Sequence, residues 1–140
     1  MKVENVRFYL HRKVLEHYST VLKKRFKRQT TVKSLTLDDL PATAMQILFE
    51  LIYKDIAKDL PREPILLMQV IKSAKHLGIA EIEEKGRECL MVSAANIRLT
   101  LEVLGDIPWV QQLLVDYLKT HLRDAAMVLL PEQLSLLLTL

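Results

Sequence analysis

The residues with the greatest capacity for chemistry are few and scattered along the chain. They are the single cysteine, Cys89, and the four histidines His11, His17, His76 and His121. The last three histidines have no Cys, Asp or Glu at the spacing of a metal site, so we expect no zinc. Cys89 falls on the predicted inner side of a helix, where a free cysteine usually behaves as a small hydrophobic residue. We interpret His11, which precedes a predicted helix, as a packing or capping residue rather than a catalytic one.

Other catalytic patterns are equally weak. The chain has three glycines, and none is adjacent to another, so no glycine-rich phosphate loop is predicted. Four carboxylates lie on the outer side of one predicted helix, as is typical of a solvated face: Glu81, Glu83, Glu84 and Glu88. We therefore expect no catalytic residue, no metal and no cofactor, and a protein that is not an enzyme.

The most distinctive local feature of the sequence is a run of basic residues. Its cations are Lys23, Lys24, Arg25, Lys27 and Arg28. Such a run can serve as a nuclear-localisation patch or contact nucleic-acid phosphates. It can equally be the solvated end of a helix, where cations interact favourably with the helix dipole. Phe26 is the only aromatic residue within the run, whereas proteins that bind single strands use several stacking rings. Nucleic acid is therefore not expected to be the main partner.

Residues 6–26 contain the elements that position these side chains. Hydrophobic Val6, Phe8 and Leu10 alternate with more polar residues, which predicts a half-buried strand. Apolar residues then recur at helical spacing, at Val14, Leu15, Tyr18, Val21 and Leu22. Ser19 and Thr20 can cap a new first turn. The pattern predicts a strand, a helix, a cap, and a second short helix that ends near Phe26.

The rest of the chain is predicted to be mainly helical. A short strand over residues 32–37 precedes a helix that has Pro41 in its first turn. The apolar face of that helix consists of Ala44, Ile47, Leu48, Leu51 and Ile52. Residues 57–64 are predicted to form a loop. Two helices are predicted to follow, one over residues 65–77 that ends at Gly78 and one over residues 79–91. The inward side of the second of these helices consists of Ile82, Gly86, Cys89 and Leu90. Beyond residue 93 only helices are predicted: residues 96–104, a helix opened by Pro108, and residues 132–140.

Charge and composition narrow the cellular setting. The net charge is +3, but residues 1–36 carry ten Lys or Arg against two Glu, which is +8, and the remainder carries −5. A basic first third can steer an acidic partner or a nucleic acid. The lone cysteine cannot form an internal disulfide, which favours a reducing compartment. Neither a signal-peptide pattern at residues 1–10 nor an apolar run of membrane-spanning length is present. We expect a protein of the cytoplasm or nucleus that does not enter a membrane.

The spacing of seven residues resembles the start of the BTB (POZ) domain: Phe8, His11, Arg12, Leu15, Ser19, Leu22 and Phe26. Residues 34–37, 38–44, 48–53 and 66–89 resemble later parts of that domain in the same order. Two departures stand out: only residues 1–5 precede the strand at Val6, so one strand is expected to be missing, and Tyr53-Lys54-Asp55 replaces Tyr-Thr-Gly. The resemblance implies an α+β, mostly α fold, a small sheet capped by helices, over residues 1–92. Residues 93–140 resemble part of a BACK (three-box) helical extension. The Leu-rich residues 134–140 would expose apolar surface, so we expect the protein to continue.

The same resemblance implies a protein-interaction function. Self-association, as a homodimer, would use His11, Val14, Leu15, Tyr18 and Leu22. Many BTB–BACK proteins are substrate adaptors of ubiquitin ligases built on cullin-3, with contacts that correspond here to residues 27–32, 53–64 and 96–122. Candidate cullin contacts are Lys27, Arg28, Tyr53, Asp55 and Trp109. Members that bind cullin-3 commonly carry a hydrophobic-x-Glu element before the third strand, where this chain is basic and has no Glu. The alternative is the BTB module of a transcription or chromatin regulator, with the basic run for nuclear import or nucleic-acid contact.

Overall fold

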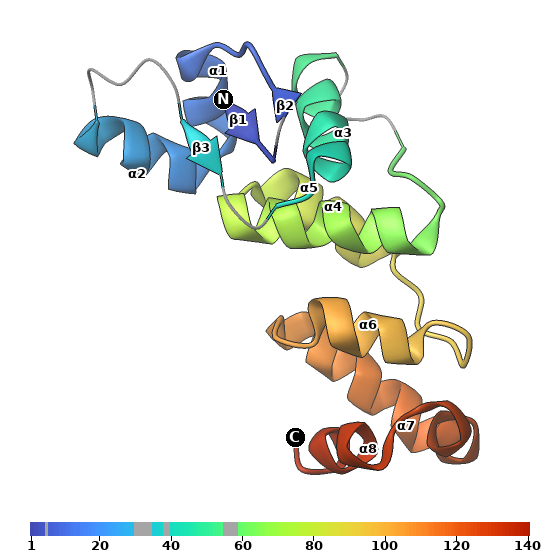
Figure 1. Ribbon diagram of the computed structural model, residues 1–140. Helices are drawn as coiled ribbons and strands as arrows, with labels where there is room; N and C mark the ends of the chain where they lie inside the picture. Colours follow the sequence, from blue (N-terminus) through green and yellow to red (C-terminus); the bar gives the residue numbers. More distant parts are fainter. Residues whose placement is uncertain (5, 30–34, 38–39, 55–58) are drawn as a thin grey trace. The chain divides into compact units, whose positions relative to one another are not determined.

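The computed structural model describes residues 1–4, 6–29, 35–37, 40–54 and 59–140 of the chain (Figure 1). The chain divides into two compact units, an N-terminal unit of residues 1–89 and a C-terminal unit of residues 90–140. The first combines a small sheet with helices, and the second is helical in its described residues. The predicted class, mostly α with a small sheet capped by helices and then a helical extension, is confirmed.

The sheet has three described strands, β1 (Lys2–Val3), β2 (Val6–Arg7) and β3 (Thr36–Leu37), in the order β2-β1-β3. β1 pairs antiparallel with β2 and parallel with β3. The expectation of a missing strand ahead of Val6 was wrong, because β1 stands there. Only two residues separate β1 from β2, and Glu4 takes a φ of 52°, the left-handed conformation that short hairpin turns use. A strand of two residues is too short to produce an alternating pattern.

β2 is shorter than the strand predicted at Val6, Phe8 and Leu10. It ends at Arg7, and Val6 is 44% exposed because it lies on the outermost strand of the sheet. Phe8, just beyond the strand, is half-buried, and its ring meets the edge of Phe49 with centroids 5.0 Å apart. Of the strand predicted over residues 32–37, Thr36–Leu37 is present, and residues 32–34 lie outside the described part of the chain.

Two short helices follow, α1 (Arg12–Tyr18) and α2 (Thr20–Arg28), and the predicted break at Ser19 is confirmed. The Ser19 hydroxyl oxygen accepts a hydrogen bond from the Leu22 amide at 3.1 Å, which caps α2. The same hydroxyl donates to the carbonyl of Leu77 at 2.5 Å. Ser19 is therefore both the cap of α2 and a link between α2 and the end of a later helix.

The three remaining helices of the N-terminal unit are α3 (Ala42–Tyr53), α4 (Pro64–Leu77) and α5 (Ala80–Cys89). The predicted inner face of α3 is buried except for Ile47, which is half-buried. Both Glu63 carboxylate oxygens accept amide hydrogen bonds in the first turn of α4. The helix ends at Gly78, whose φ of 66° confirms the predicted left-handed cap.

Packing of α5 against α4 depends on a glycine. A Cβ atom on Gly86 would lie 2.4 Å from Cγ1 of the fully buried Ile71, so only glycine allows this approach. Ile82 is buried as predicted, but the expectation that Cys89 faces inward was wrong. Cys89 is exposed because α5 ends at this residue, and no further helical turn covers its side chain.

The C-terminal unit consists of α6 (Ile97–Leu104), α7 (Pro108–Val128) and α8 (Pro131–Leu138) in its described residues. Val110, Leu114 and Leu118 of α7 are buried, but the helix is kinked at His121 (φ −135°, ψ 37°), which is exposed. Gln133 of α8 donates to the Glu102 carboxylate of α6 at 3.1 Å. Leu136, Leu138 and Leu140 are all more than half exposed, in agreement with the predicted apolar surface.

Candidate interaction surfaces

Within the described ranges of the chain, Cys89 and the four histidines are spread over α1 with its N-cap, α4, α5 and α7. Nowhere in these ranges do three or more His, Cys, Asp or Glu side chains gather where they could hold a metal ion. No helix within the described ranges is both long enough and apolar enough to cross a membrane. The features with functional potential are instead surfaces of the N-terminal unit: the outer side of α1, the exposed side of α2 and the solvent face of the sheet.

The outer side of α1 borders an open groove. The groove is lined by Lys13, Val14, His17 and Tyr18 from α1, together with Ile52 and Tyr53 from the end of α3. Two of the predicted self-association residues, Val14 and Tyr18, line this groove and are half-buried, and a third, His11, is exposed at the N-cap of α1. The other two, Leu15 and Leu22, are 3% and 1% exposed and belong to the core of the unit, so their side chains are unavailable to a second copy.

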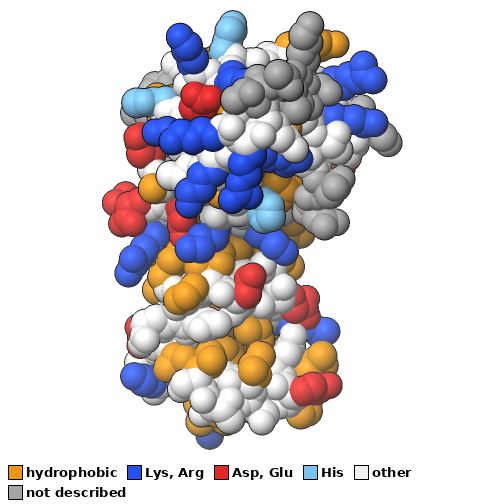
Figure 2. Space-filling model, turned by 90° about the vertical axis from the view of Figure 1, so that its left-hand side faces the viewer, with side chains coloured by type: hydrophobic (Ala, Val, Ile, Leu, Met, Phe, Trp, Pro, Cys, Tyr) orange, Lys and Arg blue, Asp and Glu red, His pale blue; other side chains and the backbone are white. Residues whose placement is uncertain are grey.

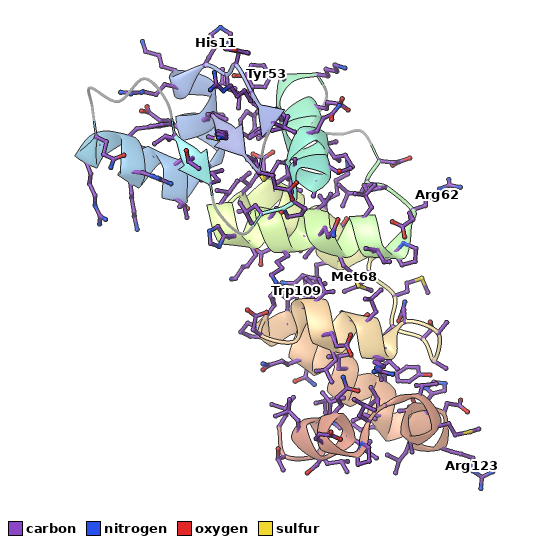
Figure 3. All side chains as sticks on the ribbon, viewed as in Figure 1. His11, Tyr53, Arg62, Met68, Trp109 and Arg123 are labelled. Atoms are coloured by element: carbon purple, nitrogen blue, oxygen red, sulfur yellow. The ribbon has the colours of Figure 1, made fainter. Side chains whose placement is uncertain are left out.

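His11 and Tyr53 connect α1 to α3, and their side chains lie close together (Figure 3). The His11 backbone amide, at the N-cap position of α1, donates to the Tyr53 hydroxyl at 2.6 Å. The Tyr53 hydroxyl is also 3.4 Å from Nδ1 of His11, and the ring centroids are 5.9 Å apart. His11 is exposed, its ring contacts that of Tyr53, and its side chain accepts no capping hydrogen bond.

The basic run lies on α2, and most of its cations are exposed. Lys23, Lys24, Lys27 and Arg28 face solvent, and Arg25 is half-buried and donates to the Thr36 carbonyl at 3.4 Å. Figure 2 shows Lys and Arg side chains spread over this side of the N-terminal unit. Phe26 is buried, and the Arg12 guanidinium lies 4.9 Å from its ring centroid. No aromatic ring within the run is therefore free to stack on a base.

The candidate cullin contacts fall in different parts of the molecule. Lys27 and Arg28 are exposed in the last turn of α2, which continues two residues beyond the end predicted near Phe26. Tyr53 is 39% exposed at the end of α3. Trp109 belongs to the C-terminal unit and is half-buried. Asp55 lies outside the described residues.

The solvent face of the sheet was missed by sequence reasoning. Lys2, Arg7, Tyr9, His11 and Thr36 line one pocket there. Burial, and to a lesser extent the positive charge of Arg7, lowers the pKa of the Met1 amino group at the rim. Arg7, Tyr9 and His11 alternate with the hydrophobic residues of the predicted strand, so the signal for three of these five residues was present. Lys2 and Thr36 could be assigned to the pocket only once the pairing of β1 with β3 was known.

Comparison with known proteins identifies the N-terminal unit. None of the curated proteins compared with the chain matches it. A family comparison matches residues 1–93, about two thirds of the chain, to the BTB/POZ domain. Domains of this family mediate protein–protein interactions and often self-associate. The match covers the sheet, the Ser19-capped helix pair and the three helices that follow. The chain therefore belongs to the BTB/POZ domain family.

Proposed function

We propose that this chain is a non-enzymatic interaction module that self-associates and serves as a substrate adaptor for a cullin-3 type ubiquitin ligase. The observation that carries self-association is the open groove beside α1, where Val14 and Tyr18 are incompletely covered by their own chain. The helices α6–α8 that follow the domain support the adaptor role, since their position and pattern resemble a BACK extension. Such an adaptor would work in the cytoplasm or nucleus.

Self-association through the outer side of α1 predicts a concentration-dependent mass. Light scattering on the wild type should give a monomer at low micromolar concentration and a rising mass above it. Val14→Glu places a charge in the groove and should hold the protein as a monomer, because an unpaired charge is costly to bury at an interface. Val21→Glu is the matched control, because Val21 is 40% exposed on the neighbouring helix and outside the groove. A wild type that stays monomeric throughout the range would refute self-association.

Cullin binding should be present but weak. Lys27 and Arg28 are both exposed where cullin-binding relatives commonly carry a hydrophobic residue and a Glu. A charge that is buried at an interface without a matching partner weakens binding. We expect a dissociation constant on the order of micromolar for a cullin-3 N-terminal fragment measured by calorimetry. Arg28→Glu should tighten binding about tenfold, the equivalent of about 1.4 kcal/mol.

Lys23→Glu is the control for this measurement. It makes the same change of charge near the other end of α2, away from the proposed contact, and should leave the affinity close to that of the wild type. Equal tightening by Lys23→Glu would point to overall charge rather than to a contact at Arg28. The absence of heat from all three proteins would remove the ligase-adaptor function and leave a self-associating module.

The alternative function, a transcription or chromatin regulator, is favoured by the exposed cations of α2. These side chains could mediate nuclear import or contact phosphates. Phosphate contacts lose affinity steeply as salt rises, whereas an apolar groove does not. Binding of a DNA duplex that weakens by orders of magnitude between about 50 and 200 mM salt, together with no cullin binding, would favour the regulator.

A further inference from the structure

The solvent face of the sheet carries a row of side chains that neither proposed function uses. The register pairs Lys2 of β1 with Arg7 of β2 on one side and with Thr36 of β3 on the other. Directly paired residues project to the same face of a sheet. All three are exposed, and all three line the same pocket. In the neighbouring row Val3 and Leu37 are buried and Val6 is 44% exposed, so that row is apolar where this one is polar and charged.

The charges in this row are unbalanced. Lys2 and Arg7 lie directly opposite each other, an arrangement of like charges that destabilises a strand pair. Among the described residues no Asp or Glu lines the pocket, and neither cation forms an ion pair with a carboxylate. A further guanidinium lies next to this row, because Arg25 donates a hydrogen bond to the carbonyl oxygen of Thr36. The pocket therefore presents paired cations and the exposed Thr36 hydroxyl with no anion of its own among these residues.

We propose that this pocket binds the carboxylate side chains of an acidic peptide segment from a partner protein. A carboxylate placed between Lys2 and Arg7 would relieve their repulsion and accept charge-assisted hydrogen bonds from both. The Thr36 hydroxyl offers a neutral donor at the end of the same row. The side chains of Tyr9, which is 90% exposed, and His11 supply apolar and polar walls that a peptide can contact.

Charge and ring placement favour a peptide over a nucleic acid at this pocket. Among the described residues that line it, Tyr9 is 90% exposed and His11 is exposed, whereas the Phe8 ring packs against Phe49. Proteins that bind single strands need a series of stacking rings along a basic groove. The row instead places two cations, Lys2 and Arg7, in one pocket, an arrangement that suits one or two carboxylates. Among the described residues, the pocket shares only His11 with those predicted to self-associate and none with the candidate cullin contacts Lys27, Arg28, Tyr53 and Trp109.

Fluorescence anisotropy on the full 140-residue chain tests the proposal. The probe is a fluorescein-labelled decapeptide in which Glu alternates with Ala, and the matched probe carries Gln in place of Glu. The variants are Lys2→Glu/Arg7→Glu and, as a control of equal charge change on α2, Lys23→Glu/Lys24→Glu. Protein concentrations are chosen at which light scattering gives the proteins the same mass, and circular dichroism compares their helix content.

We expect the wild type to bind the Glu peptide at least tenfold more tightly than the Gln peptide. Lys2→Glu/Arg7→Glu should lose at least tenfold in affinity, and Lys23→Glu/Lys24→Glu should keep affinity within about twofold. Lys2→Ala/Arg7→Ala, which only removes the repelling charges, should fold normally and also lose binding. Equal losses from both double charge reversals, or no binding by the wild type, would overturn the proposal. A single-stranded oligonucleotide of matched charge that binds at Lys2 and Arg7 when the Glu peptide does not would also overturn it.

Discussion

Replacement of Leu51 by alanine is expected to lower the free energy of unfolding of the N-terminal unit by about 2–5 kcal/mol. Leu51 is 3% exposed on the inner side of α3, where the helix packs against α4. Truncation of a buried leucine loses both its transfer free energy and its packing, because the surrounding core relaxes only partly. Denaturant unfolding followed by circular dichroism measures the change.

Glu50→Ala is the control for Leu51→Ala. Glu50 precedes Leu51 on the same helix but is only half-buried, and its carboxylate accepts one long hydrogen bond from Gln46 at 3.4 Å. Its removal should change the free energy of unfolding by roughly 0.5 kcal/mol at most. Similar small effects at the two positions would contradict the placement of Leu51 in the core of this helix pair.

The helices could be predicted because their apolar residues repeat over several turns. α3 and α4 contain 12 and 14 residues, long enough for a repeat of 3.6 residues to define one face. The break at Ser19 and the end at Gly78 were found because their capping chemistry belongs to particular residue types. β1 was missed because two residues cannot display a period of two, and Cys89 was misplaced because a helical pattern does not specify the residue at which burial stops.

The candidate surfaces were harder to predict for a different reason. Periodicity identified Leu15 and Leu22 as apolar and on one side of the helices, but it does not distinguish a face covered by the same chain from one covered by a second copy. In the structure, the side chains of Leu15 and Leu22 are both buried in the core of the N-terminal unit. The pocket on the sheet depends on the pairing of Lys2 with Arg7 and Thr36, which is a property of register rather than of spacing.

Ser19→Ala is the second substitution with a large expected effect. Ser19 is 1% exposed, and its hydroxyl makes two hydrogen bonds, one from the Leu22 amide and one to the Leu77 carbonyl. Loss of an N-cap costs about 0.5–2 kcal/mol. A buried carbonyl left without its partner costs a further 1–3 kcal/mol or so. Because both losses come from one atom, we expect a decrease of about 2–4 kcal/mol in the free energy of unfolding.

Thr20→Ala and Ser19→Thr separate the two roles of this position. Thr20 is exposed and its hydroxyl lies 3.4 Å from the Gly78 carbonyl, so its removal should cost less than about 1 kcal/mol. Ser19→Thr keeps the hydroxyl and should retain more stability than Ser19→Ala, apart from the strain of one added methyl group in a buried site. Chemical denaturation of the three variants ranks their free energies of unfolding. If Ser19→Ala were no less stable than Thr20→Ala, the hydroxyl would not link α2 to the end of α4, and the start of the BTB helix pair would depend on packing at Leu22 and Phe26 alone.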